Sequence, residues 1–334
     1  MNEAELDDAL SSPRPETEAA LAACPGDVIV LGAGGKMGPT LAQMARRAAR
    51  DSRRVIAVSR WSSADARRHL EEAGVETVSA DLLDHDAVTR LPDAPNVVFM
   101  AGQKFGTTGA PELTWGMNTL VPAYCAERYR DSRIVAFSTG NVYALTPVES
   151  GGSHEGDALA PVGEYAASCV GRERMFELAS RTHGTRAAIL RLNYAIDLRY
   201  GVLVDIALKV FRAEPVSVDM GYVNVIWQGD ANRIALEALP LASAPPFLLN
   251  LTGRETLSVR DLATWFGKRF GKQPRFSGSE RTDALLSNTG RLSSSFAPSR
   301  ASVDDMRAWV ADWIESGAPL LGKPTKFETR DGKF

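Results

Sequence analysis

Short apolar runs alternate with segments of helical spacing along most of the chain. Runs of aliphatic and β-branched residues predict strands at 28–31, 55–58, 76–79, 96–102, 133–138, 187–191 and 247–251. Amphipathic spacing predicts helices near 63–73, 115–130, 202–211, 258–270 and 302–313. Strands that alternate with helices indicate an α/β fold, a doubly wound parallel sheet covered by helices on both faces. Ligands of such sheets bind at the carboxyl ends of the strands.

A glycine-rich turn follows the first of these strands. Gly32, Gly35 and Gly38 allow a sharp backbone turn, and the segment after them has helical apolar spacing. A strand, a glycine turn and a helix N-terminus together form a cradle for a dinucleotide pyrophosphate. A P-loop is excluded because Gly35 and Lys36 are followed by Met37, where that motif needs serine or threonine. We therefore expect these residues, Lys36 and Met37 included, to bind a dinucleotide.

Composition and charge exclude several classes of protein. The chain has 334 residues, of which 44% are hydrophobic and 24% charged, as in soluble globular proteins. The net charge of -3 offers no basic surface to a nucleic acid, and no apolar run is long enough for a membrane span. Cys24, Cys125 and Cys169 lie far apart, and neither they nor the histidines show metal-ligand spacing. We expect a cytoplasmic protein without disulfides, a metal, a nucleic-acid partner or a membrane anchor.

The pattern divides the chain into three parts. Residues 1–26 are acidic and alanine-rich, unlike a signal peptide, and we interpret them as an N-terminal tail that is mobile or forms a short docking helix. Residues 27–195 form the expected Rossmann-type, dinucleotide-binding domain. Residues 196–334 form mainly a smaller C-terminal substrate-binding region, with about 222–240 returning to the Rossmann core. The polar, basic stretch 322–334, here called the C-terminal segment, wraps the surface or reaches a partner subunit.

The end of the second strand indicates which dinucleotide binds. NAD-binding units of this kind place an acidic residue there to hold the ribose 2′-OH. This chain has Ser59 and Arg60, so no carboxylate repels a 2′-phosphate and a cation is available to pair with one. We predict NADP in preference to NAD; the alternative is that Arg60 is a surface charge and that Ser59 tolerates either cofactor. Asp81 and Leu82 follow the third strand and are placed to meet the adenine, although Asp81 also suits a helix cap.

Further motifs follow along residues 27–316. Each alone is a weak signal, but their order and spacing together are specific. They are the Gly32-x-x-Gly35-x-x-Gly38 loop, Asp81-Leu82, Ala101-Gly102, Asn118, Ser138-Thr139, Tyr165, Arg191-Leu192-Asn193, and residues 224–230 and 250–253. The whole resembles the extended short-chain dehydrogenase/reductase superfamily, of the NAD(P)-dependent epimerase/dehydratase type. The resemblance implies cofactor contacts at Ala101, Gly102, Asn118, Tyr165 and position 169, and substrate contacts at Ser138 and Asn193. Trp115 follows the fourth strand and either lines the substrate pocket or simply packs, and Tyr194 is a candidate wall of the pocket.

The same resemblance implies the chemistry of the site. In that family a serine or threonine binds the substrate oxygen, which here falls on Ser138 or Thr139, and a tyrosine, here Tyr165, is the general acid/base. A lysine four residues after the tyrosine binds the nicotinamide ribose and lowers the tyrosine pKa, but position 169 is cysteine. A free tyrosine has a pKa of ~10, so a base at neutral pH needs a depression of roughly three units, or about 4 kcal/mol.

Cys169 leaves three interpretations open. Another cation replaces the lysine, either Arg172, on the same helix face as Tyr165, or Lys104, in the loop after the fourth strand. Alternatively, Tyr165 acts only as an acid in a reduction. In the third interpretation the site binds the cofactor without catalysis.

We therefore expect an NAD(P)-dependent oxidoreductase or epimerase. It would transfer a hydride to or from a carbinol or keto carbon of a carbohydrate-like small molecule, with Tyr165 exchanging the proton. The alternative of a different class is a non-catalytic NADP-binding or sensor protein. The resemblance also implies a homodimer that forms through the helices near 115–130 and 164–180.

Overall fold

Seven parallel strands lie side by side in the order β12-β7-β5-β4-β1-β2-β3. The computed structural model describes residues 1–106 and 109–334. The strands are β1 (Val28–Leu31), β2 (Val55–Ser59), β3 (Glu76–Ser79), β4 (Asn96–Phe99), β5 (Arg133–Thr139), β7 (Arg186–Leu192) and β12 (Phe247–Leu251). Each lies where an apolar run predicted it, so the doubly wound Rossmann-type fold is confirmed. The strand order reverses between β1 and β4, where such sheets bind ligands.

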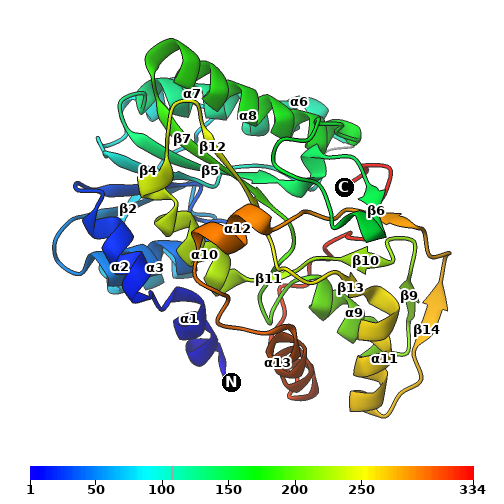
Figure 1. Ribbon diagram of the computed structural model, residues 1–334. Helices are drawn as coiled ribbons and strands as arrows, with labels where there is room; N and C mark the ends of the chain where they lie inside the picture. The colour runs from blue at the N-terminus through cyan, green and yellow to red at the C-terminus, as the bar shows by residue number, and fades with distance from the viewer. Residues whose placement is uncertain (107–108) are drawn as a thin grey trace.

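Alternate residues of β1 pack on opposite faces of the sheet, as the period of a strand requires. Val28 and Val30 join the apolar core under α2, α3 and α10, whereas Ile29 and Leu31 join the core under α5, α7 and α8 (Figure 1). The helices are α1 (Glu3–Ser11), α2 (Pro15–Ala22), α3 (Gly38–Ala49), α4 (Ala64–Glu72), α5 (His85–Thr89), α6 (Pro111–Trp115), α7 (Val121–Arg128), α8 (Gly163–His183), α9 (Val202–Phe211), α10 (Gln228–Glu237), α11 (Val259–Phe270), α12 (Gly290–Ser295) and α13 (Val303–Glu315). None of these helices in the described part of the chain is both long and apolar enough to cross a membrane.

The N-terminal segment is not a mobile tail: it folds as two short helices that dock on the fold, where one short docking helix was the alternative expectation. Leu6 and Leu10 on α1 and Leu21 on α2 are buried, and α1 and α2 pack against α3 and α10. The Asn232 side chain on α10 donates a hydrogen bond to the Leu10 carbonyl at 3.2 Å. The sequence did not predict this helical face, because residues 1–26 contain few large apolar side chains and many acidic ones.

The helix predicted near 115–130 is divided into three pieces. A π-helical turn at Gly116–Leu120 separates α6 from α7, and the Val121 amide donates to the Gly116 carbonyl, five residues earlier. Pro122 has no amide hydrogen with which to continue the normal four-residue pattern. Such π turns frequently occur at functional sites. This one carries the fully buried Asn118, whose contacts are described below.

The C-terminal region has its own apolar core, formed by α1, α9, α11 and α13. Four two-stranded sheets complete it: β6 (Thr146–Pro147) with β15 (Asp283–Ala284), β8 (Ala195–Ile196) with β11 (Ile226–Trp227), β9 (Pro215–Ser217) with β14 (Arg275–Ser277), and β10 (Tyr222–Val223) with β13 (Leu257–Ser258). Short 3₁₀ turns lie at Gly140–Val142, Val148–Ser150 and Leu239–Leu241.

The C-terminal segment wraps this chain's own surface and returns toward β6 (Figure 1). The Thr325 amide and hydroxyl both donate to the Asp205 carboxylate on α9, at 2.7 and 2.5 Å. Arg330 forms an ion pair of 2.6 Å with Asp283 on β15, and Phe327 is buried. Three points along the segment are therefore fixed to the C-terminal region.

Candidate active site

The glycine turn after β1 forms an open cradle at the start of α3. Gly32 has a φ of +87°, and a Cβ there would lie 2.6 Å from the Ala101 nitrogen. A Cβ on Gly38 would lie 2.4 Å from the Ala33 carbonyl oxygen. The residue before the helix, Met37, forms no side-chain cap, so the first amides of α3 stay available to an anionic ligand. These residues fit the pyrophosphate of a dinucleotide.

The ends of β2 and β3 carry the residues predicted to select the cofactor. Ser59 lies against the turn, since a Cβ on Gly34 would stand 2.3 Å from its hydroxyl oxygen. The Arg60 side chain is 70% exposed, and its guanidinium lies 3.8 Å from the Asp81 carboxylate. Asp81 also accepts a hydrogen bond from the Leu83 amide at 3.0 Å. Leu82 is buried in the core between the sheet and α7, so its side chain packs there.

Asn118 braces the loop after β4 from behind the pocket wall. Its side chain donates to the Gln103 carbonyl and accepts from the Gln103 amide, both at 2.9 Å. It also donates to Ser168 at 2.9 Å and accepts from Arg172 at 2.7 Å. The hydrogen bonds of the Asn118 side chain thus go to other protein groups. Asn118 therefore positions the loop after β4, and the loop is what can contact a cofactor. Gly102 lies in that loop and admits Arg172, which stands 2.4 Å from where its Cβ would be.

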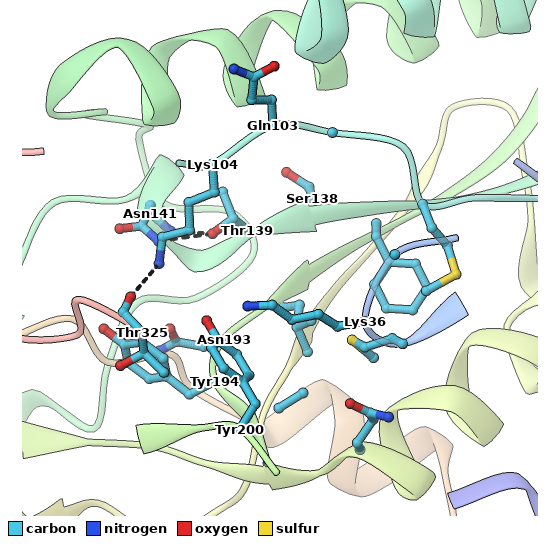
Figure 2. Close-up of a pocket in the computed structure, with 18 of the residues that line it drawn as sticks. Lys36, Gln103, Lys104, Ser138, Thr139, Asn141, Asn193, Tyr194, Tyr200 and Thr325 are labelled. Carbon is cyan, nitrogen blue, oxygen red and sulfur yellow. Dashed lines mark hydrogen bonds between the residues drawn. The ribbon is translucent and has the colours of Figure 1, made fainter. Parts of the chain in front are cut away.

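Tyr165 and Thr139 meet at the wall of a cavity of about 400 Å³ that begins at the glycine turn. The Thr139 hydroxyl and the Cys169 thiol lie close enough to the Tyr165 phenol to act on its pKa, Thr139 lowering it and Cys169 raising it. Thr139 accepts hydrogen bonds from the Asn141 side chain and amide, at 3.0 and 3.2 Å, which leaves its own hydrogen for Tyr165 (Figure 2). Burial raises the pKa of Tyr165 above its ordinary value, and Cys169 raises it further.

Ser138 and Thr139 differ in their contacts. The Ser138 hydroxyl donates to the Glu173 carboxylate at 2.5 Å, and Glu173 forms a buried ion pair with Arg191. Ser138 lines the same cavity, but its hydroxyl hydrogen is donated to Glu173 on α8. Of the two predicted hydroxyls, Thr139 is the one that acts on the pKa of Tyr165.

Position 169 carries a neutral, buried thiol. Cys169 packs with Val142 and Tyr143, and burial raises the pKa of its thiol above the ordinary value. Arg172 is close enough to lower the pKa of Tyr165, but its guanidinium is held by the Phe137 carbonyl and by Asn118, both at 2.7 Å. All three cysteines are free and buried.

Two lysines reach into the cavity from opposite sides (Figure 2). The Lys36 ammonium lies 3.1 Å from the centroid of the Tyr200 ring, on the side of α9. The Lys104 ammonium donates to the Thr325 carbonyl at 3.3 Å and lies 5.8 Å from the centroid of the Tyr165 ring. Burial lowers the pKa of Lys36 to about 7 and that of Lys104 to about 8.

The predicted substrate residues divide into two groups. Asn193 and Tyr194 line the cavity, where the Asn193 amide donates to the Leu285 carbonyl at 3.1 Å. Trp115 is 40% exposed and lies outside the lining of this cavity, because its indole donates to the Glu164 carboxylate at 2.6 Å on α8. The prediction for Trp115 followed its place after β4, and the bond to Glu164 has no signal in the sequence.

Several lining residues were not predicted. Gln103 and Phe105 follow β4, and Gln228 opens α10, so the rule that ligands bind at strand ends could have found them. Thr325 comes from the C-terminal segment and has no such signal. The same segment packs the Phe334 ring edge-on against Tyr165, with centroids 5.4 Å apart. Among the described residues, no group of three or more His, Cys, Asp or Glu side chains is arranged to hold a metal ion.

Comparison with known proteins agrees with this geometry. No curated protein matches the chain in sequence. The UDP-glucose 4-epimerase of Thermotoga maritima is 15% identical with a TM-score of 0.71, over 87% of this chain and 99% of that chain. The NAD complex of UDP-glucuronic acid 4-epimerase from Bacillus cereus is 16% identical with a TM-score of 0.72, over 87% and 99%. The NAD complex of UDP-glucose 4-epimerase from Thermus thermophilus is 20% identical with a TM-score of 0.71, over 87% and 100%.

These likenesses show the fold. A family model matches residues 28–195, about half of the chain, from the first strand of the sheet to the wall of the cavity. The matched stretch contains the glycine turn, Thr139 and Tyr165. The chain therefore belongs to the NAD dependent epimerase/dehydratase family.

Proposed function

We propose that this protein is an NAD(P)-dependent oxidoreductase or epimerase that acts on a carbinol or keto carbon of a carbohydrate-like substrate. The observation that carries the proposal is that Tyr165 and Thr139 line the same wall of a cavity that opens from the glycine turn, with Thr139 close enough to act on the pKa of the Tyr165 phenol. A phenol next to a hydroxyl donor is suited to hold one substrate oxygen from two sides. The sugar nucleotides named for the structural neighbours support the substrate class.

In the proposed reaction, Tyr165 exchanges the proton of the substrate oxygen and Thr139 donates a hydrogen bond to that oxygen. The bound dinucleotide supplies the hydride acceptor or donor. In oxidation, the substrate hydroxyl gives its proton to Tyr165 as the carbon loses its hydride. In reduction, Tyr165 returns the proton to the keto oxygen. Ser138 keeps the end of β5 in place through Glu173.

The raised pKa of Tyr165 sets the favoured direction. A phenol that stays protonated at neutral pH is ready to act as an acid, and as a base it needs roughly three pKa units of depression. Arg172 lowers the pKa of Tyr165, and the Lys104 ammonium lies 5.8 Å from the centroid of the Tyr165 ring, where it is a second candidate cation. We therefore propose that keto reduction is faster than alcohol oxidation near pH 7. We propose these two cations as the partial substitutes for the lysine that is absent at Cys169.

For the cofactor, we propose NADP in preference to NAD. Ser59 and Arg60 present no carboxylate of their own to a 2′-phosphate. Arg60 is paired with Asp81 at 3.8 Å, but exposed ion pairs contribute only about 0–1 kcal/mol, so the guanidinium can turn to a phosphate at small cost. A 2′-phosphate offers Arg60 two charge-assisted hydrogen bonds in place of one distant partner.

The proposed function is tested with cofactor titrations and with turnover on a panel of sugars, sugar acids and UDP-sugars. We expect Tyr165→Phe to lower kcat by about a hundredfold or more while it keeps cofactor binding, since removing an acid/base costs 10²- to 10⁴-fold. Tyr222→Phe, on β10 and outside the cavity lining, is the matched control. If the wild type binds NADP but turns over nothing, and Cys169→Lys gains turnover, the non-catalytic alternative replaces this proposal.

A further inference from the structure

We propose that Lys36 and Lys104 form an anion subsite that binds a negatively charged group of the substrate. The inference rests on the proposed function and narrows its substrate class to carbohydrates that carry a carboxylate or a phosphate. The two side chains start from different loops, at the glycine turn and after β4, and enter one cavity (Figure 2). The chemistry they share is recognition of anionic oxygen atoms by ammonium donors.

The Lys36 ammonium reaches to Tyr200, which precedes α9 (Figure 2). Its ammonium sits over the Tyr200 ring at 3.1 Å and lies 5.2 Å from the centroid of Phe105. The backbone amides of Gly38 and Thr40 at the start of α3 would hold a pyrophosphate, and that role would not need the Lys36 side chain. Tyr200 precedes α9, in the region that holds the substrate walls. The charge of Lys36 is therefore directed to the substrate side.

Lys104 completes the subsite next to the acid/base. Its ammonium contacts the Thr325 carbonyl and lies 4.3 Å from the centroid of the Phe334 ring. A carbonyl uses one of its three ammonium hydrogens and leaves the others for a ligand. Since Tyr165 lies beside it, a group bound here stands close to the reacting carbon of the substrate.

The charges around the two ammonium groups favour an anion. Lys104 and Lys323 lie near Lys36 and disfavour its charged form, and Lys326 does the same to Lys104. Among the described residues, no Asp or Glu side chain forms an ion pair with Lys36 or Lys104. The acids that favour the charged forms of these lysines include Asp205, already bonded to Thr325, and Glu328, already paired with Lys209 at 3.6 Å. A bound anion would relieve this repulsion.

Binding of two matched ligand pairs tests the subsite independently of turnover. D-glucuronate and D-glucuronamide differ only in the carboxylate, and UDP and uridine differ only in the diphosphate. Calorimetry is done on the full chain with NADP bound, for the wild type, Lys36→Met, Lys104→Met and Lys36→Arg. Lys268→Met, an exposed lysine on α11, is the control. Circular dichroism shows that each variant is folded.

We expect the wild type to prefer the charged member of one pair by about tenfold or more, and each lysine-to-methionine variant to lose most of that preference. Lys36→Arg and Lys268→Met should keep it. Loss confined to the glucuronate pair identifies a carboxylate, and loss confined to the UDP pair identifies a phosphate. The proposal is overturned if the wild type prefers neither charged ligand, or if the preference survives in both methionine variants.

These outcomes separate the subsite from the proposed function. A lysine-dependent preference without turnover of any sugar refutes the proposed function and leaves the subsite. Turnover of sugars at equal efficiency, whether charged or neutral, refutes the subsite and leaves the proposed function.

Discussion

The buried ion pair between Glu173 and Arg191 holds the carboxyl end of β5 against α8, and its removal is expected to destabilise the fold strongly. Arg191 donates to both carboxylate oxygens of Glu173, with its shortest contact at 2.7 Å, and also to the Tyr143 hydroxyl at 2.6 Å. Ser138 donates to the same carboxylate. The side chains of the pair are 0% and 3% exposed. We therefore choose Glu173→Gln, which keeps the shape of the side chain and removes its charge.

An exposed ion pair with the same N–O distance serves as the reference for the loss in unfolding free energy. Arg47 and Asp8 also lie 2.7 Å apart, but their side chains are 42% and 66% exposed. Removing one partner of a buried pair costs about 3–5 kcal/mol, because the other charge stays buried without a counter-charge. Removing one partner of an exposed pair costs about 0–1 kcal/mol. At about 2 °C per kcal/mol for a chain of this size, Glu173→Gln should lower Tm by about 6–10 °C.

Calorimetry and urea unfolding measure both variants, with Asp8→Asn as the control. Combining Glu173→Gln with Arg191→Met removes both charges, so the double variant should lose less stability than the sum of the two single variants. A loss below about 1 kcal/mol for Glu173→Gln would refute the reasoning, because the buried and exposed pairs would then be equivalent. The reasoning would also be refuted if the stability losses of the two single variants added up to that of the double variant, because the two charges would then not interact.

Three further predictions concern ligand binding. Gly38→Ala places a Cβ 2.4 Å from the Ala33 carbonyl oxygen, so NADPH titrated by fluorescence should bind at least about tenfold more weakly; unchanged affinity would show that the turn has room. Arg60→Ala should weaken NADP but not NAD, and equal effects on both would end the case for Arg60. Because burial and Lys104 hold the pKa of Lys36 near 7, and anion binding needs the protonated form, D-glucuronate affinity should fall from about pH 6 to about pH 9, whereas a flat calorimetric profile contradicts the assignment.

Much of the sheet could be predicted because its strands are short apolar runs bounded by polar residues. The inner strands β1 and β4 are buried on both faces, so nearly every residue in them is apolar and the signal is local; the edge strand β3 is partly exposed and carries a weaker signal. The glycine turn is local as well, since Gly32 needs a positive φ and Gly38 needs close packing. The break at Gly116–Leu120 was missed because the apolar spacing continues through it, although Pro122 is a visible cause.

The parts that could not be predicted depend on contacts between distant segments. Ser138 and Thr139 are neighbours of similar chemistry, and only the position of Glu173 on α8 separates their contacts. In the sequence, Lys36 is only a residue of the glycine turn. Its side chain reaches Tyr200, a contact that the sequence does not show. The place of Thr325 in the wall follows from its bonds to Asp205. Such contacts leave no periodicity in the sequence.

The loss of a lysine at position 169 changes how charge is delivered to Tyr165. A lysine there would lie one helical turn along α8 and would move with the tyrosine. Lys104 instead comes from the loop after β4, which Asn118 braces, and its ammonium is held by the Thr325 carbonyl of the C-terminal segment. If Lys104 acts on the phenol as proposed, the field there depends on a loop and on a distant segment, each fixed by its own hydrogen bonds. A buried thiol at Cys169 is compatible with that arrangement, since a second ammonium so close would add to the repulsion that already lowers the pKa of both cavity lysines.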